Sequence, residues 1–173
     1  NPSAKMQDSS KTTAIKIAMW SGPRNISTAM MRAFENRLDT TVWDEPLYGY
    51  YLNETGSDHP GAKEIIDTWG DAWQPIIAKL SGPIPDGKSI WYQKHMTHHL
   101  LVDIDRSWID STASCFLIRD PRYVLASYRQ KREKVTVEDL GFPQQSEIFD
   151  RISQRLGHAP PVIDSKDVLM NPE

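Results

Sequence analysis

The stretch Ser21–Thr28 combines residue types that could bind a phosphate or sulfate group. It follows an apolar run that predicts a buried strand, and it leads into a predicted helix. A loop between a strand and a helix N-terminus presents free backbone N–H groups and the positive end of the helix dipole to an anion. Arg24 adds a cation with bidentate geometry, and Ser27 and Thr28 add hydroxyl donors. The alternative interpretation is that Ser27 only caps the helix and that Arg24 is a solvated loop residue.

The same stretch is not a Walker A motif, which requires the pattern G-x-x-x-x-G-K-S/T. Ser27 stands five positions after Gly22, and the stretch contains no lysine. The lysine that contacts the β- and γ-phosphates is therefore absent. This argues against an ATP or GTP hydrolase and for a different phosphate ligand.

A second stretch with binding chemistry begins at Arg119, directly after another apolar run. Asp120-Pro121 is a helix-start signal, since Asp caps helices and Pro is favoured at the first helical position. Ser127 follows Arg119 by eight positions, about two turns into the predicted helix. Both side chains can therefore reach one ligand if the helix packs over the site. The alternative is a salt bridge from Arg119 to Asp120 or Asp164.

Short apolar runs alternate with stretches of helical period along the chain, and this order predicts an α/β fold. The predicted strands are Ala14–Trp20, Thr41–Asp44, Ser89–Gln93, Ser114–Ile118 and Pro161–Asp164. The predicted helices are Ser27–Arg37, Ala62–Leu80 with an interruption at Pro75, Pro121–Arg132 and Gln144–Leu156. We expect a parallel β-sheet flanked by helices, with ligands bound beyond the carboxyl ends of the strands.

The two ends of the chain differ from the rest. Residues 1–12 are polar and without period, which is typical of an expression tag or a disordered N-terminus. We assign residues 13–173 to a single domain. Ser165–Glu173 indicates the entry to a helix, with Asn171-Pro172-Glu173 as its start signal. We therefore expect this domain to be truncated at its C-terminus.

The composition excludes several classes of protein. Hydrophobic residues make up 39% of the 173 residues, enough for the core of one domain. A net charge of −3 argues against nucleic-acid binding by bulk electrostatics. No window approaches the roughly 20 apolar residues of a membrane span. A single cysteine, Cys115, excludes an internal disulfide and fits a reducing compartment, so we expect a cytoplasmic protein. The oligomeric state is not predicted.

Pro23–Thr28 and the Arg119–Ser127 pair, taken together, resemble the sulfotransferase family that uses 3′-phosphoadenosine 5′-phosphosulfate (PAPS). The segment SGPRNISTAMMRAFENR, together with the later segments DEP and QKHMTHH, is most similar to the bacterial sulfotransferase-like group of this family. Arg24 stands where cytosolic members usually carry Lys, and Met30 or Met31 stands near the place of an aromatic residue that stacks on adenine.

The resemblance implies a P-loop NTPase-like three-layer sandwich. It implies transfer of a sulfuryl group from PAPS to a hydroxyl or amine of a small acceptor, with 3′,5′-adenosine diphosphate as the product and no requirement for a metal ion. Arg119 and Ser127 are implied to bind the 3′-phosphate. The residues implied to bind the 5′-phosphosulfate are Arg24, Asn25, Ile26, Ser27 and Thr28.

The segment QKHMTHH, at the end of the third predicted strand, contains candidates for the chemistry. Sulfuryl transfer needs a base for the acceptor and positive charge on the leaving oxygen. Cytosolic members carry Lys-x-His here; Lys94 matches the Lys, but Met96 occupies the His position. We prefer His95 as the base and Lys94 as the electrostatic group, with His98 as the next candidate. Glu45, followed by proline, is the rival base, because carbohydrate-type members carry a similar Glu-Pro and burial raises the pKa of a carboxyl group.

Other interpretations stay open. The chain could be a P-loop kinase or nucleotide hydrolase, or a non-catalytic nucleotide-binding module on the same fold. A zinc site built from His95, His98 and His99 is disfavoured because no cysteine lies near. Arg129–Lys134 (RQKREK) indicates a solvated helix face and loop. The aromatic residues that could line an acceptor pocket, or belong to the core, are Tyr48, Tyr50, Tyr51 and Trp69.

Overall fold

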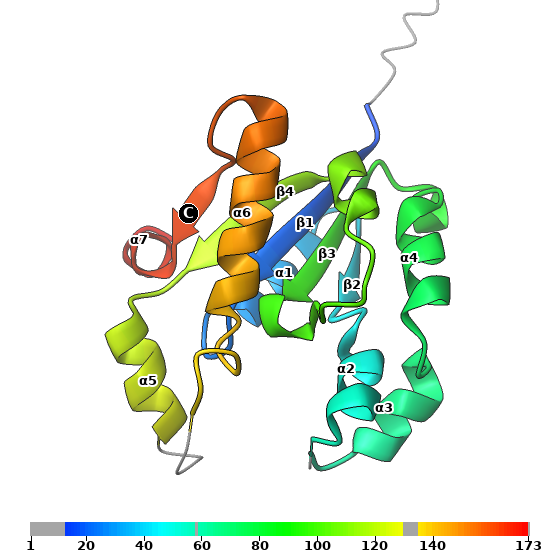
Figure 1. Cartoon of the computed structure of the whole chain (residues 1–173). Helices are drawn as coiled ribbons and strands as arrows, with labels where there is room; N and C mark the ends of the chain where they lie inside the picture. The colour runs from blue at the N-terminus through cyan, green and yellow to red at the C-terminus, as the bar shows by residue number, and fades with distance from the viewer. Residues whose placement is uncertain (1–12, 58, 130–134, 173) are drawn as a thin grey trace, which may run out of the picture.

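The computed structural model describes residues 13–57, 59–129 and 135–172. In that part of the chain five parallel strands form one sheet in the order β2-β3-β1-β4-β5 (Figure 1). The strands are β1 (Ile15–Ser21), β2 (Thr40–Asp44), β3 (Ile90–Met96), β4 (Ala113–Ile118) and β5 (Val162–Asp164). The predicted parallel sheet is confirmed, and β1 and β3 occupy the middle of it together with β4.

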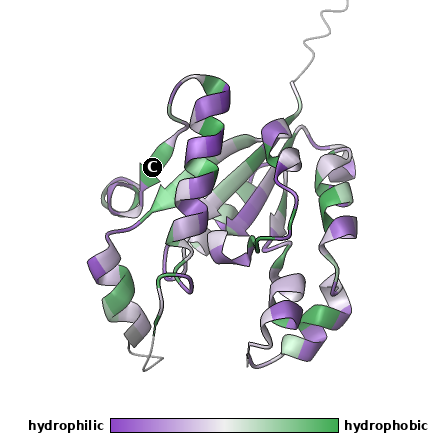
Figure 2. Ribbon diagram, in the orientation of Figure 1, coloured by the Kyte–Doolittle hydropathy of each residue, from purple (hydrophilic) through white to green (hydrophobic). Residues whose placement is uncertain are grey.

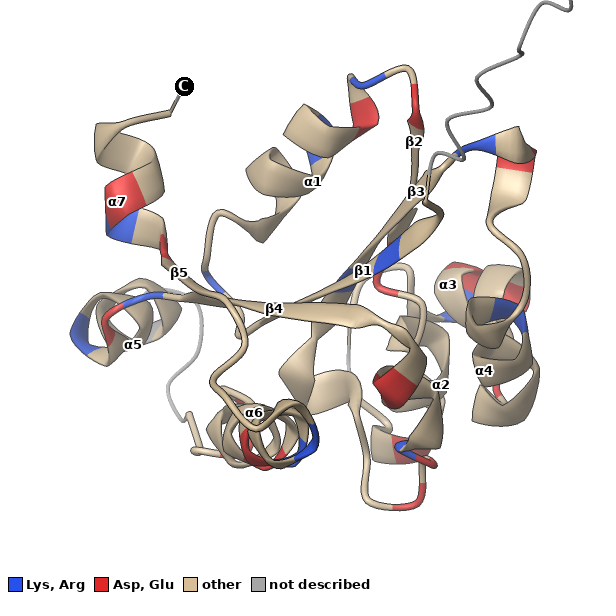
Figure 3. Ribbon diagram, turned by 90° about the horizontal axis from the view of Figure 1, so that it is seen from above, with Lys and Arg blue, Asp and Glu red and all other residues tan. Residues whose placement is uncertain are grey.

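Helices cover both faces of this sheet. They are α1 (Ser27–Glu35), α2 (Tyr48–Thr55), α3 (Ala62–Trp69), α4 (Trp73–Ser81), α5 (Pro121–Arg129), α6 (Phe142–Leu156) and α7 (Ser165–Met170). Figure 3 shows α1 on one side of the sheet and α4 and α6 on the other. The predicted three-layer α/β arrangement is therefore confirmed.

The alternation of side chains along each strand divides the core into two clusters. Trp20 of β1 packs in the larger cluster, with Ile148 of α6. Its neighbour Met19 packs on the opposite face, with Met31 of α1. Hydrophobic and hydrophilic residues alternate along α6 (Figure 2), as expected for a helix with one face on the sheet and one in solvent. Every strand residue is thus assigned to one of two faces.

The break in the helical region after residue 62 differs from the prediction. The helix ends at Trp69 and a second one starts at Trp73, so the interruption lies at Gly70 rather than Pro75. Gly70 has φ +88°, a conformation that glycine adopts without a steric penalty. Pro75 lies in the first turn of α4, where a backbone N–H has no partner within the helix.

Two further local features differ from the sequence-based expectations. The helix α2 was not predicted, because its sequence YGYYLNET has no clear apolar period. Asn171 ends α7 instead of starting a helix, while Asp164 accepts a hydrogen bond from the Lys166 backbone N–H at 2.9 Å and starts α7. The interpretations of residues 1–12 and of most of Arg129–Lys134 fall outside the described residues.

Gly141 allows the start of α6 to approach the end of β3. Its φ is +69°, and a Cβ atom added there would lie 2.6 Å from the backbone nitrogen of His98 and closer still to Thr97 Oγ1. Thr97 begins the short 3₁₀ turn Thr97–His99 that continues β3. Only glycine fits this contact without displacing the turn.

We predict that Gly141→Ala lowers the free energy of unfolding more than Gly157→Ala does. Gly157 also has a positive φ, of +74°, but an added Cβ would meet nothing within 4 Å. The control variant should cost about 1 kcal/mol for the left-handed conformation alone. Gly141→Ala should cost a further 1–3 kcal/mol, on the order of other overpacked sites. Urea unfolding of both variants measures the difference, and equal losses would show that the turn shifts at no cost.

Candidate active site

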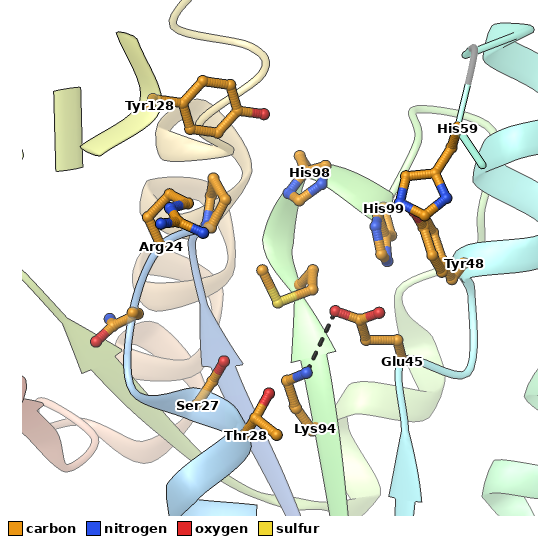
Figure 4. Close-up of a pocket in the computed structure, with 13 residues that line it drawn as sticks. Arg24, Ser27, Thr28, Glu45, Tyr48, His59, Lys94, His98, His99 and Tyr128 are labelled. Carbon is orange, nitrogen blue, oxygen red and sulfur yellow. Dashed lines mark hydrogen bonds and ion pairs between the residues drawn. The ribbon is translucent and has the colours of Figure 1, made fainter. Parts of the chain in front are cut away.

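A cleft of about 550 Å³ opens beyond the carboxyl ends of β1, β2 and β3. This is the edge of the sheet at which both candidate stretches were expected to bind a ligand. The side chains and backbone that line it come from Pro23, Arg24, Asn25, Ser27, Thr28, Glu45, Tyr48, His59, Lys94, Met96, His98, His99 and Tyr128. Figure 4 shows these residues around the opening.

The first turn of α1 lies at one side of the cleft. The N-cap residue is Ile26, so the alternative interpretation of Ser27 as a cap is wrong. Among the described residues no side chain caps this helix, and its first turn contains no acidic residue. Ser27 and Thr28 line the cleft. The N–H groups of the turn and the positive end of the helix dipole are therefore available to an anion.

Arg24, in the first stretch predicted to bind a phosphate group, contacts two residues of the second stretch. Its backbone is left-handed, with φ +58°, and its Nε donates a hydrogen bond to Ser127 Oγ at 2.8 Å. Arg119 Nη1 donates to the Arg24 carbonyl oxygen at 2.6 Å. The alternative pairing of Arg119 with Asp120 is wrong, since Asp120 pairs with Arg122 at 2.6 Å. The structure thus brings Arg119 and Ser127 to the loop after β1.

Two other residues predicted to bind the cofactor shape the loop. Asn25 Nδ2 donates to the Leu117 carbonyl oxygen at 3.1 Å, which ties the loop to β4. Ile26 packs against the cluster on the α1 face and does not line the cleft. Arg119 lines an adjoining cavity of about 250 Å³, which shares Pro23 and Asn25 with the main cleft.

Lys94 and Glu45 meet at the centre of the cleft. The Lys94 side chain is only 5% exposed, and its Nζ lies 2.9 Å from Asp44 Oδ1 and 3.3 Å from Glu45 Oε1. Glu45 follows β2 with a left-handed backbone, φ +48°, and its side chain is 25% exposed. Burial raises the pKa of Glu45 above its ordinary value, and the positive charge of Lys94 opposes part of that rise.

His95 does not reach the cleft. It follows Lys94 on β3, so its side chain points to the opposite face of the sheet. There its ring stacks on Trp20 at 4.6 Å between centroids and lies 5.2 Å from Trp108. Nε2 of His95 lies 3.2 Å from Gln93 Oε1. Burial lowers the pKa of His95 to about 3. The expected position of His95 beside Lys94 in the site is therefore wrong.

Aromatic and imidazole rings line the part of the cleft beyond Glu45. Tyr48 was among the aromatic candidates and lines the cleft, whereas Tyr50, Tyr51 and Trp69 do not. The Tyr50 hydroxyl instead donates to Asp103. The sequence offered no signal for His59, which lies between the helices α2 and α3. Tyr128 had only its position next to Ser127 as a signal.

In residues 13–57, 59–129 and 135–172, no three His, Cys, Asp or Glu side chains are grouped as a metal site would require. No helix in the same part of the chain is long and apolar enough to cross a membrane.

Comparison with known proteins matches residues 15–173 to a family described as sulfotransferase domain. Branched-chain-amino-acid aminotransferase-like proteins 1 and 2 of Arabidopsis thaliana are 31% identical over 160 residues and 29% identical over 157. Each match covers 91% of this chain, and the chain spans 28% of the length of these curated relatives. A solved structure, shikimate kinase from Bacteroides thetaiotaomicron, is 13% identical with a TM-score of 0.46, over 87% of this chain and 86% of that one.

The burial of His95 predicts a loss of stability in mild acid. The unfolded chain protonates His95 near pH 6.5, whereas the folded protein does so only near pH 3. Stability is therefore fully present above pH 6.5 and declines as the pH falls below it, by up to about 1.4 kcal/mol per pH unit. Burial also lowers the pKa of His99, which acts in the same direction.

Urea unfolding between pH 7.5 and 5 measures this dependence in three proteins. The variant His95→Phe keeps the stacked ring but has no titrating group, so the decline should become shallower. His158→Gln changes an exposed histidine and should leave the decline as it is in the parent. An equal decline in His95→Phe and the parent would contradict the prediction.

Proposed function

The chain belongs to the sulfotransferase domain family, and on that premise we propose that it transfers a sulfuryl group from PAPS to a hydroxyl or amine of a small acceptor. One observation carries the proposal: an uncapped helix end, Arg24, Arg119 and Ser127 converge on a single loop beside a buried Lys94. The single cysteine, Cys115, supports a cytoplasmic location.

The residues fit a ligand with phosphate groups at two positions. The first turn of α1, with Ser27 and Thr28, offers N–H and hydroxyl donors on the floor of the cleft. Lys94 and Arg24 supply positive charge there. We assign these donors and cations to the 5′-phosphosulfate of PAPS. Charge-assisted hydrogen bonds are about twice as strong as neutral ones, so such a set of residues favours a charged ligand group.

Arg119 and Ser127 are proposed to bind the 3′-phosphate. Both already contact Arg24, one through its carbonyl oxygen and one through its side chain. The Arg24–Ser127 hydrogen bond joins two groups that we assign to different phosphates. Binding of the nucleotide therefore replaces this bond with one charge-assisted contact from each partner, an exchange that favours the complex.

Glu45 is proposed as the general base in place of His95. Its carboxylate lines the cleft, while the imidazole of His95 is buried on the other face of the sheet. PAPS supplies an activated sulfuryl group and a nucleotide that leaves. Glu45 accepts the proton of the acceptor, which its raised pKa favours, and Lys94 stabilises the negative charge that develops on the leaving oxygen.

We predict that 3′,5′-adenosine diphosphate raises the melting temperature without magnesium, and that AMP raises it less. At 100 times its Kd a ligand stabilises the fold by about 2.7 kcal/mol, which thermal shift detects. Arg24→Ala should weaken binding of the bisphosphate by about tenfold to a hundredfold, since one charge-assisted contact contributes roughly 1.5–3 kcal/mol.

The control for Arg24→Ala is Arg32→Ala. Arg32 lies on α1, the helix that follows the loop of Arg24. It pairs with Glu35 at the exposed end of that helix, away from the cleft. Its substitution should leave the affinity unchanged. Equal shifts from AMP and the bisphosphate, or a preference for Mg-ATP over both, would refute the proposed function.

We predict that Glu45→Gln lowers the rate of sulfuryl transfer by about 10²–10⁴-fold, the usual loss on removal of a general base. The affinity for 3′,5′-adenosine diphosphate should persist, because the amide keeps the shape of the side chain. Asp44→Asn is the matched control: it removes the other carboxylate beside Lys94, but Asp44 does not line the cleft. The rate at which 3′,5′-adenosine diphosphate forms from PAPS measures the activity of both variants. Comparable losses in the two variants would indicate that Glu45 acts only by holding Lys94.

A further inference from the structure

The cleft has two chemically different halves. The donor half consists of Arg24, Asn25, Ser27 and Thr28. The ring half consists of Tyr48, His59, His98 and His99. Figure 4 shows Glu45 and Lys94 between them, with Tyr48, His59 and His99 on the side of Glu45 away from Ser27 and Thr28. A molecule in the ring half therefore lies next to the proposed base.

The rings of this half are held by one another. Tyr48 stacks on His99 with centroids 4.7 Å apart and an interplanar angle of 8°. His59 meets the edge of Tyr48 at 5.6 Å and 76°. Behind them, Tyr51 packs on His99 at 4.8 Å, and His99 is only 3% exposed. A preformed wall of ring faces and edges suits a flat aromatic ligand, whose own face and edge make offset or edge-to-face contacts.

The charges around the cleft disfavour a cationic acceptor. Among the described residues that line it, Arg24 and Lys94 oppose a single carboxylate, Glu45, which already pairs with Lys94. Burial lowers the pKa of His99, so its imidazole stays neutral near pH 7. Among the described residues that line the cleft, no carboxylate remains to pair with an ammonium group, because Glu45 already pairs with Lys94. A neutral hydroxyl meets no such penalty.

We propose that the ring half binds a neutral aromatic alcohol and presents its hydroxyl to Glu45. This inference rests on the function proposed above and narrows its acceptor from any hydroxyl or amine to a phenol-like compound. A phenol has a pKa of about 10, as tyrosine does, so it is a far stronger acid than an aliphatic alcohol. A carboxylate base, even with a raised pKa, is better matched to that proton.

The step balances without an additional reactant. The phenol oxygen forms a bond to the sulfur of PAPS as the bond from sulfur to the bridging phosphate oxygen breaks. The phenol proton passes to the Glu45 carboxylate, and the electron pair of the broken bond stays on the 5′-phosphate of 3′,5′-adenosine diphosphate. Lys94 Nζ, 3.3 Å from Glu45 Oε1, lies where it can stabilise the oxygen anions on either side.

Three ligands of similar skeleton test the proposal: 2-naphthol, its saturated analogue decahydro-2-naphthol, and 2-naphthylmethylamine. Their dissociation constants are measured by calorimetry on protein saturated with 3′,5′-adenosine diphosphate, and their turnover with PAPS is followed by mass spectrometry. We expect 2-naphthol to bind about tenfold tighter than the saturated alcohol, because each contact between aromatic rings contributes binding free energy beyond that of the buried apolar surface. We expect sulfation of 2-naphthol alone.

Substitution of the wall provides the structural control. Tyr48→Leu should weaken binding of 2-naphthol by about 3- to 10-fold and remove its advantage over the saturated alcohol. Tyr123→Leu alters a tyrosine that is 61% exposed on α5 and should change neither value. If Tyr48→Leu does not fold, His59→Ala removes the edge contact from an exposed position and should give a smaller loss in the same direction.

The outcomes separate this inference from the proposed function. Equal binding and turnover of the saturated alcohol, or a preference for the amine, would overturn the proposal of an aromatic acceptor. If 3′,5′-adenosine diphosphate still binds, the sulfotransferase proposal stays intact. Failure of the bisphosphate to bind would overturn the proposed function, and this inference with it. Unchanged selectivity in both wall variants would show that the rings do not recognise the acceptor.

Discussion

Successive side chains of β3 point to opposite faces of the sheet, and the cleft depends on that alternation. Lys94 points to the face that carries α1 and meets Glu45, while His95 points to the face that carries α6 and packs on Trp20. One residue of shift would exchange these positions and bury a lysine among tryptophans. The parallel pairing of β3 with β1 and β2 holds that register, because Lys94 is level with Met19 on one side and Asp44 on the other.

The charge balance at Lys94 follows from its burial. A lysine that is 5% exposed needs partners, and Asp44 and Glu45 provide two carboxylates from the end of the neighbouring strand. Glu45 reaches its place through a left-handed backbone, and Arg24 does the same in the loop after β1. Such conformations are unfavourable for residues other than glycine and concentrate at functional sites. Strain and buried charge therefore occur together at this end of the sheet.

The sequence was sufficient for the sheet, the loop after β1 and the convergence of Arg119 with Ser127, because these depend on local patterns that end strands and begin helices. It was insufficient where tertiary packing decides. His95 is nearest to a strand end in sequence, yet the face of its side chain follows from the register. The Lys94–Glu45 contact joins two segments that are far apart in the sequence, so no local pattern predicts it, although both residues were candidates. Nothing local marks His59, which reaches the cleft because α2 packs on the turn Thr97–His99 after β3 and His59 contacts Tyr48 of α2.

The two halves of the cleft come from different connections of the chain. The loop between β1 and α1, together with α5, supplies Arg24 and Ser127, whereas the long segment between β2 and β3 supplies Tyr48 and His59. Changes around Tyr48 and His59 would alter the part of the ring half that this segment supplies, and would leave in place the donor half and the two histidines of the turn after β3, His98 and His99. Divergence within this architecture can thus proceed at the exposed positions of a single crossover, while Ile76, Ile77 and Leu80 of α4 stay in the core beneath.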